Sequence, residues 1–246
     1  MKHPEEAEDP RRRLLIQALA AGVFSMWLPG NNALAESIFG SRPTKLPKGQ
    51  SIYRIRGEAW VNGKAANMET RIKPGDTVQT GKDSELIFVV NGNHSMILRE
   101  DSHLETEAVK DTLGSLLING LRILTGKLLS VSRHAKIQVR TTTASLGIRG
   151  TGFYVEADPQ LTYFCTCYGT TDISAISDPT SKTTVESKHH DRPLYIVSDA
   201  GKGKNIRNAP FINHTDQELT LIEALVGRTT PFIFDNSSYN APRREY

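Results

Sequence analysis

The stretch that decides the fold runs from Arg140 to Glu156 and has the sequence RTTTASLGIRGTGFYVE. Two segments at its ends, Ile137–Thr141 and Phe153–Glu156, carry the β-branched and aromatic residues that favour strands. Three glycines stand between them, namely Gly147, Gly150 and Gly152. Because glycine adopts positive φ angles at little steric cost, we expect a glycine turn that joins two short strands.

Short segments with strand character, separated by turn signals, precede this stretch. The turn signals are Asn62-Gly63, Lys73-Pro74-Gly75-Asp76 and Asn91-Gly92. An Asn-Gly pair is the strongest short hairpin signal, and a Pro-Gly pair fits a tight turn. The strands that we expect are Tyr53–Val61, Thr77–Gly81, Leu86–Val90, Ser95–Leu98, Leu116–Ile118 and Leu121–Val131. The run from Leu113 to Leu124 is also compatible with a short helix, but the glycines inside it disfavour that alternative.

The chain beyond this stretch is expected to add further strands and one helix. Asp158-Pro159 turns the chain into a hairpin strand at Leu161–Tyr168, and Leu194–Ser198 is the last expected strand. A capping box at Thr215 and Glu218 starts the helix, and Gly227 stops it. The helical face that we expect to be buried consists of Leu219, Ile222, Leu225 and Val226.

The order of the turn signals resembles the FecR-like extracytoplasmic domain family over roughly Ile52 to Ile173. The residues that carry the resemblance are Gly57, Gly63, Pro74-Gly75-Asp76, Thr80-Gly81, Asn91-Gly92 and Arg149-Gly150-Thr151. Gly152 departs from the family, which usually has a charged or polar residue after Arg-Gly-Thr. The resemblance implies an all-β fold, a short irregular β-solenoid or β-roll, here with one C-terminal α-helix and an extended tail.

The first 35 residues have the features of an export signal. Arg11-Arg12-Arg13 precedes the apolar stretch Leu14–Leu28, and a small-x-small site ends at Ala35. The arginines resemble a twin-arginine signal, which implies transport of the folded protein, while ordinary secretion remains the alternative. We expect four regions: a signal peptide at 1–35, a flexible leader at 36–50, a β-domain at 51–200, and a C-terminal helix and arm at 201–246. The mature chain is then periplasmic and has no transmembrane segment, because no further apolar run reaches the length of a membrane span.

Charge and cysteine content exclude several classes of protein. The net charge of the 246 residues is only +3, with both signs mixed along the chain, which gives no indication of nucleic-acid binding. The two cysteines, Cys165 and Cys167, are too few for a disulfide scaffold.

These two cysteines are nevertheless the most unusual local feature. On a strand, Cys165 and Cys167 point to one face, and their Cβ atoms lie about 6.6 Å apart, so a disulfide between them requires a local bulge. Two thiolates on one face can instead hold a transition metal such as Zn or Cu. The candidate further ligands are His189 and His190, of which only one can reach that face from a regular strand. The alternatives are thiol-redox chemistry and two buried core cysteines that behave as small hydrophobic residues.

Known catalytic patterns do not occur. Gly147–Gly152 lacks the Lys-Ser/Thr ending of a phosphate-binding loop, and the sequence has neither Gly-x-Ser-x-Gly nor His-Glu-x-x-His. The remaining histidines are expected at the surface or in hydrogen bonds, and they include His94, His103, His134 and His214. We therefore expect no enzyme.

The function that these observations favour is a non-enzymatic binding or regulatory module of the cell envelope, active in signalling. FecR-like regulators join the extracytoplasmic domain to a cytoplasmic anti-sigma segment, which we expect to be lacking because only about ten residues precede the signal. An envelope protein is the expected partner, and the candidate binding residues are Arg149, Arg243, Arg244 and Tyr246. The alternative is a metal-binding or thiol-redox envelope protein that uses Cys165 and Cys167.

Overall fold

The structure, a computed structural model, describes residues 43–232. The predicted signal peptide with its cleavage site after Ala35 lies outside the described residues. So does the predicted arm from residue 233 onward, with Arg243, Arg244 and Tyr246.

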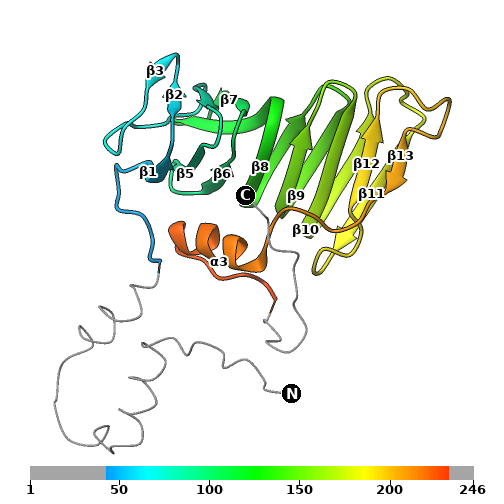
Figure 1. Ribbon diagram of the computed structural model, residues 1–246. Coiled ribbons are helices and arrows are strands. Elements are labelled where there is room, and N and C mark those ends of the chain that lie inside the picture. Colours follow the sequence, from blue (N-terminus) through cyan, green and yellow to red (C-terminus); the bar gives the residue numbers. More distant parts are fainter. Residues whose placement is uncertain (1–42, 233–246) are drawn as a thin grey trace, which may run out of the picture. The chain divides into compact units, whose positions relative to one another are not determined.

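Within this range the chain forms a sheet of thirteen strands and one helix (Figure 1). The strands are β1 (Ile52–Arg56), β2 (Ala59–Val61), β3 (Lys64–Ala65), β4 (Thr77–Thr80), β5 (Glu85–Val90), β6 (His94–Leu98), β7 (His103–Lys110), β8 (Leu116–Arg140), β9 (Ala144–Ala157), β10 (Leu161–Ala175), β11 (Lys182–Ser187), β12 (Leu194–Val197) and β13 (Ile206–Asn208). The helix is α3 (Asp216–Leu225). The predicted all-β class with a C-terminal helix is confirmed.

The main path through the sheet runs β13-β12-β10-β9-β8-β7-β4-β2-β3. A branch joins β8 to β6, β5 and β1 in turn, and β11 pairs with β10. Each of these pairings is antiparallel. The predicted hairpins at Asn62-Gly63, Asn91-Gly92 and Asp158-Pro159 are the β2–β3, β5–β6 and β9–β10 connections.

Apolar side chains cover both faces of the sheet where it meets α3. Side chains alternate between faces along a strand, so Phe164 of β10 joins the core of one face and Cys165 joins the cluster on the other. The first core collects residues from β1 to β12. The second cluster lies between the sheet and α3, whose buried residues Leu219, Ile222 and Leu225 belong to it. We call the face that α3 covers the outer face.

Helix α3 begins and ends as its sequence predicts. The Thr215 side chain accepts a hydrogen bond from the Glu218 backbone, and the Glu218 carboxylate accepts one from the Thr215 backbone. Gly227 follows the helix with φ +72°. The helix packs against β6 and β8, and the buried Arg99 next to β6 forms an ion pair with Glu218 at 2.8 Å.

The predicted glycine turn at Gly147–Gly152 is wrong, because β9 runs through it without interruption. Only Gly150 has a positive φ, +63°, and it lies where the pairing with β10 changes register. Gly152 instead permits a close approach, since a Cβ there would lie 2.5 Å from the Tyr168 ring. These glycines therefore serve a bulge and a packing contact inside a strand.

Two strand boundaries also differ from the prediction. The expected strand Tyr53–Val61 is divided into β1 and β2 at Gly57, whose φ is +71°. In contrast, the two expected strands between Leu116 and Val131 are parts of one strand, β8, of 25 residues. Gly126 bends that strand with φ +92° and lies against Ser102, so it distorts the strand without ending it.

The segments flanking the predicted β-domain are tied to it. Residues 43–50 of the predicted leader include Leu46, whose backbone N–H donates to the carbonyl of Leu225 at 2.9 Å. The sheet extends beyond residue 200 because β13 pairs with β12. Among the described residues, no helix has the length and apolar character needed to cross a membrane.

Candidate metal centre

The two cysteines lie on β10, on the outer face and close to α3. Both are free thiols with no exposed surface. Cys165 pairs with Tyr154 of β9, and the register shifts between Thr166 and Tyr168 make Cys167 the extra residue of a bulge. As the sequence predicts, both side chains join the same cluster. The thiols therefore point toward α3 in a site without solvent contact.

His190 reaches the cysteines from the loop between β11 and β12. Its backbone N–H donates to the carbonyl of Cys167 at 2.9 Å, and its φ of +53° marks a left-handed turn. The Asp191 carboxylate holds this loop by accepting hydrogen bonds from the backbone of Lys188 and His189. His190 Nδ1 consequently lies 3.4 Å from the Cys165 sulfur.

His214 completes the group from the residue before the N-cap of α3. Its Nε2 lies 3.2 Å from His190 Nδ1, and its Nδ1 lies 2.7 Å from the carbonyl oxygen of Ile212. The imidazole ring stacks on Tyr154 with a centroid distance of 4.5 Å. His214 is 2% exposed, so the ring is fixed between the sheet and the start of the helix.

Four potential ligand atoms thus converge, from Cys165, Cys167, His190 and His214, and all lie within 4.8 Å of one another. A second group overlaps the first at His190 and consists of His189, His190 and Asp216. The Asp216 carboxylate lies 2.9 Å from His189 Nε2 and 3.0 Å from His190 Nε2. We call the first group the Cys-His cluster.

The hydrogen bonds define the tautomers of the two histidines. A carbonyl oxygen only accepts, so His214 donates to Ile212 through Nδ1–H and its neutral ring has a lone pair on Nε2. Likewise, His190 donates to the Asp216 carboxylate through Nε2–H, which leaves the lone pair on Nδ1. With both rings neutral, the two lone pairs would face each other at 3.2 Å. Without a metal, a proton on His190 Nδ1 satisfies both nitrogens, and a metal ion would take the place of that proton.

Ionisation within the Cys-His cluster is strongly perturbed. Burial alone would raise the pKa of Cys165, but hydrogen bonds with Cys167, His190 and His214 hold it well below its usual value. Burial and the neighbouring Cys165 raise the pKa of Cys167 well above its usual value. Burial also opposes protonation of His190, yet its hydrogen bonds to Asp216 and Cys165 raise its pKa to about 9. The site therefore favours a thiolate at Cys165 and a cation beside it.

Aromatic rings seal the cluster from solvent. The Phe211 ring lies 4.5 Å from the rings of His190 and His214, and the Phe232 ring lies 4.4 Å from that of His189. These rings exclude water from the space between the sheet and the helix. Because Cys165 and Cys167 have no exposed surface, the cluster fits a closed site rather than a catalytic one.

The structure brings together three of the four predicted metal ligands. Cys165, Cys167 and His190 converge, whereas His189 turns to Asp216 and keeps 39% of its side chain exposed. Sequence reasoning missed His214, which it assigned to a surface or hydrogen-bonded role. A signal was present, because His214 directly precedes the capping box that fixes the start of α3.

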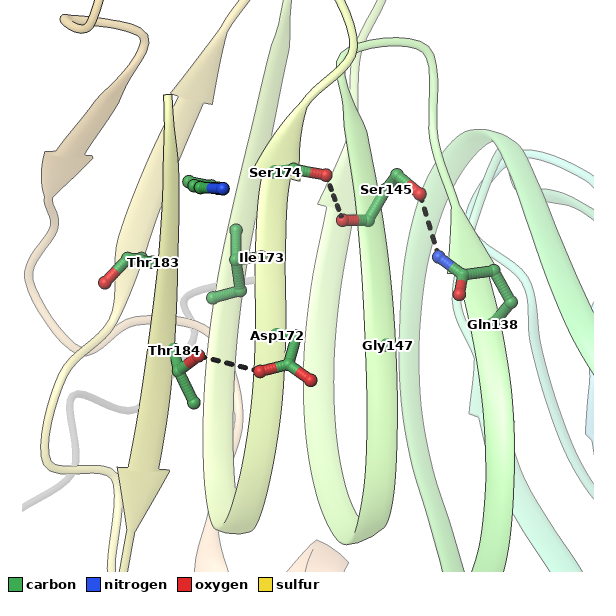
Figure 2. A pocket seen from close by; sticks show the side chains of 9 residues that line it. Gln138, Ser145, Gly147, Asp172, Ile173, Ser174, Thr183 and Thr184 are labelled. Carbon is green, nitrogen blue, oxygen red and sulfur yellow. Dashed lines mark hydrogen bonds between the residues drawn. The ribbon is translucent and has the colours of Figure 1, made fainter. Parts of the chain in front are cut away.

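The predicted binding residue Arg149 lies elsewhere, beside a polar groove of about 610 Å³ on the sheet. Figure 2 shows Gln138, Ser145, Asp172, Ser174 and Thr184 lining this groove from four neighbouring strands. Arg149 forms an ion pair with Asp172 at 2.8 Å, and about half of its side chain is exposed. The structure thus separates this open polar surface from the buried Cys-His cluster.

The middle of the chain matches a known protein family. Residues 76–167 match the family described as FecR protein, so the resemblance inferred from the sequence is confirmed for this segment. The match includes both cysteines of the cluster and ends before its two histidines. No protein with a curated function matches the sequence.

Two crystal structures from Parabacteroides distasonis, of a protein provisionally described as an anti-sigma factor, are also similar. Both are 14% identical to this chain, with TM-scores of 0.43 and 0.42. Each alignment covers 58% of this chain and 62% of the other, so the chain spans less than two thirds of the solved structures.

Proposed function

We propose that this chain is a non-enzymatic binding or regulatory module of the cell envelope that is exported to the periplasm. The match of residues 76–167 to the FecR family carries the proposal, because that family is one of regulatory proteins. The signal-like residues 1–35 support the periplasmic location. On this proposal the sheet is a scaffold that presents a binding surface to an envelope protein.

Arg149 and the groove next to it are the surface that we propose for this partner. The groove is open, and hydroxyl, amide and carboxylate groups line it together with Ile173 and Lys182 on neighbouring strands. Arginine is favoured at interface centres because its planar cation makes several hydrogen bonds at once. The ion pair with Asp172 holds the Arg149 side chain in place while leaving about half of it accessible.

The test is a pulldown from envelope extract with the mature chain and two charge-reversal variants. Arg149→Glu should abolish recovery of a specific partner. Arg122→Glu is the matched control, because Arg122 is also a half-exposed arginine paired with a carboxylate, on β8. Equal recovery with both variants would contradict the assignment of this surface. Recovery of no specific partner with the wild-type chain under several growth conditions would contradict the proposed function.

The predicted arm offers a second contact for the same partner, through Arg243, Arg244 and Tyr246. Its contribution is tested by ending the chain after Phe232. The Phe232 ring is kept in this variant because it packs against His189, next to the Cys-His cluster. If the arm binds the partner, the chain that ends after Phe232 should keep its melting temperature and lose the partner. A large fall in melting temperature would instead show that the arm is part of the fold.

A second candidate function, metal binding or thiol-redox chemistry, is favoured by the convergence of Cys165 and Cys167 with two histidines. The burial of both thiols distinguishes metal binding from thiol-redox chemistry. Reactive cysteines occupy partly exposed positions, so complete burial favours a bound metal over redox exchange.

A further inference from the structure

We propose that Cys165, Cys167, His190 and His214 bind one Zn²⁺ ion in a closed tetrahedral site that fastens the start of α3 to the sheet. The coordinating atoms are the two sulfurs, His190 Nδ1 and His214 Nε2. The proposal goes beyond the FecR domain, since His190 and His214 lie outside residues 76–167.

The spacing of the atoms fits a tetrahedron around zinc. Zinc lies about 2.0–2.3 Å from nitrogen and sulfur ligands, so a regular tetrahedron of these atoms has edges of roughly 3.3–3.8 Å. The Cys165 sulfur lies 3.4 Å from His190 Nδ1. His190 Nδ1 lies 3.2 Å from His214 Nε2. Two edges of the cluster are therefore already close to the lengths that a zinc ion requires.

The hydrogen bonds behind the ligands orient them for a metal. Histidine ligands usually donate their second N–H to a carboxylate or a backbone carbonyl, which fixes the ring and the tautomer. His190 donates to Asp216, and His214 donates to the carbonyl of Ile212. Both coordinating nitrogens thus present lone pairs to the same point, where a cation satisfies them.

The summed charge of the four ligands favours a divalent ion. Two thiolates and two neutral imidazoles carry a charge of −2, which one Zn²⁺ balances, whereas Cu⁺ would leave a net negative charge. A buried net charge is unfavourable, and all four ligands are buried or nearly so. Tetrahedral coordination by two sulfurs and two nitrogens is also the arrangement that zinc prefers in structural sites.

The position of the site indicates what a bound metal would stabilise. Its ligands come from β10, from the β11–β12 loop and from the residue before the cap of α3, three segments far apart in the sequence. A metal that joins them holds α3 over the outer face of the sheet. All four coordination positions are filled by the protein, so the site stabilises the fold and leaves none open for catalysis.

The test is zinc content of the full chain, purified without an affinity tag, loaded with Zn²⁺ and dialysed. We expect one equivalent per chain, and its loss in Cys167→Ser and His214→Gln. His189→Gln is the matched control, because His189 is the neighbouring histidine outside the Cys-His cluster. Loss of zinc in His189→Gln but not in His214→Gln would contradict the proposal and assign the zinc to His189, His190 and Asp216. Absence of zinc from the wild-type chain would also overturn the proposal.

A second measurement uses the unmodified chain and does not depend on whether variants fold. Cobalt(II) in place of zinc should produce an intense thiolate-to-metal charge-transfer band, which a site of histidine and carboxylate ligands cannot produce. Removal of the metal by a chelator should also lower the melting temperature by about 10 °C. Bound cobalt without a thiolate band would contradict coordination by Cys165 and Cys167.

Discussion

Tyr168 occupies a space that exists because residue 152 has no side chain. The ring lies against Gly152, and its hydroxyl donates to the buried carboxylate of Glu223, which also accepts a hydrogen bond from Arg228 at 2.7 Å. The ring cannot move aside without breaking the contact with Glu223. A small residue at position 152 therefore positions a polar contact between the sheet and α3.

Gly152→Ala should destabilise the fold. The new Cβ would lie 2.5 Å from the Tyr168 ring, so we expect a loss of about 1–3 kcal/mol in the free energy of unfolding, measured by chemical denaturation. Gly147→Ala is the control on the same strand, because its Cβ would meet Asp172 at an ordinary distance of 3.6 Å. That variant should be neutral or slightly more stable. Equal effects of the two substitutions would contradict the packing role of Gly152.

The buried His94 should make the stability of the fold depend on pH. Burial, together with the positive charge of Arg228, lowers the pKa of His94 from 6.5 to about 4. The unfolded chain therefore takes up a proton first as the pH falls, and stability decreases from about pH 6.5 down to about pH 4. His94→Asn should remove roughly 2–4 kcal/mol of this decrease.

The measurement for His94 is denaturation of wild type and variant at a series of pH values between 7 and 4. His103→Asn is the control, because the His103 side chain is about one third exposed. If His94→Asn lost as much stability on acidification as the wild type, a neutral buried His94 would not be the cause.

At the scale of elements, α3 is held by charge as well as by its apolar face. Arg99 is almost fully buried, contacts Glu218 at 2.8 Å and Glu85 at 3.8 Å, and lies over the Tyr154 ring. Its Nη2 also donates to the carbonyl of Asn213, in the segment that leads into the helix. One cation thus connects the sheet to the start of α3, on the side where His214 belongs to the Cys-His cluster.

Arg99→Met should cost about 1.5–3 kcal/mol in the free energy of unfolding, because it removes the charged hydrogen bonds from the sheet to Glu218 and to the carbonyl of Asn213. Arg122→Met is the matched control, since Arg122 pairs with Glu105 at an exposed position. That control should change stability by less than about 1 kcal/mol. Chemical denaturation measures both, and a small effect of Arg99→Met would show that α3 is held by its apolar face alone.

Elements with local signals could be predicted from the sequence. Helix α3 was predictable because its cap, apolar face and stop all lie within thirteen residues, from Thr215 to Gly227. The Asn-Gly hairpins were predictable for the same reason. The glycines of β9 were misinterpreted as a turn. Their role depends on partners distant in sequence, such as Tyr168 for Gly152.

The same limit applies to the candidate metal centre. The shared face of Cys165 and Cys167 follows from strand geometry, so the sequence predicts it. His214 was missed although it directly precedes the capping box, because its place beside His190 depends on how α3 folds back over the sheet. The choice between His189 and His190 depends on the left-handed conformation of His190, which the sequence does not specify.

At the scale of the whole molecule, the predicted export route bears on how a metal would be acquired. Cytoplasmic thiols remain reduced, so a chain that folds before export can bind zinc there. Replacing Arg11 and Arg12 with Lys should block export through the twin-arginine route, measured as mature protein in the periplasm. Arg13→Lys is the control, because Arg13 occupies the free position of the signature. Normal export of the double variant would contradict transport in the folded state.

The most direct test of the account is a crystal structure of the zinc-loaded chain with anomalous diffraction recorded on both sides of the zinc absorption edge. We predict one anomalous peak, surrounded by the sulfurs of Cys165 and Cys167, His190 Nδ1 and His214 Nε2, with α3 docked on the outer face. A peak between His189 and Asp216, or zinc-loaded crystals with no peak near the cysteines, would contradict the account.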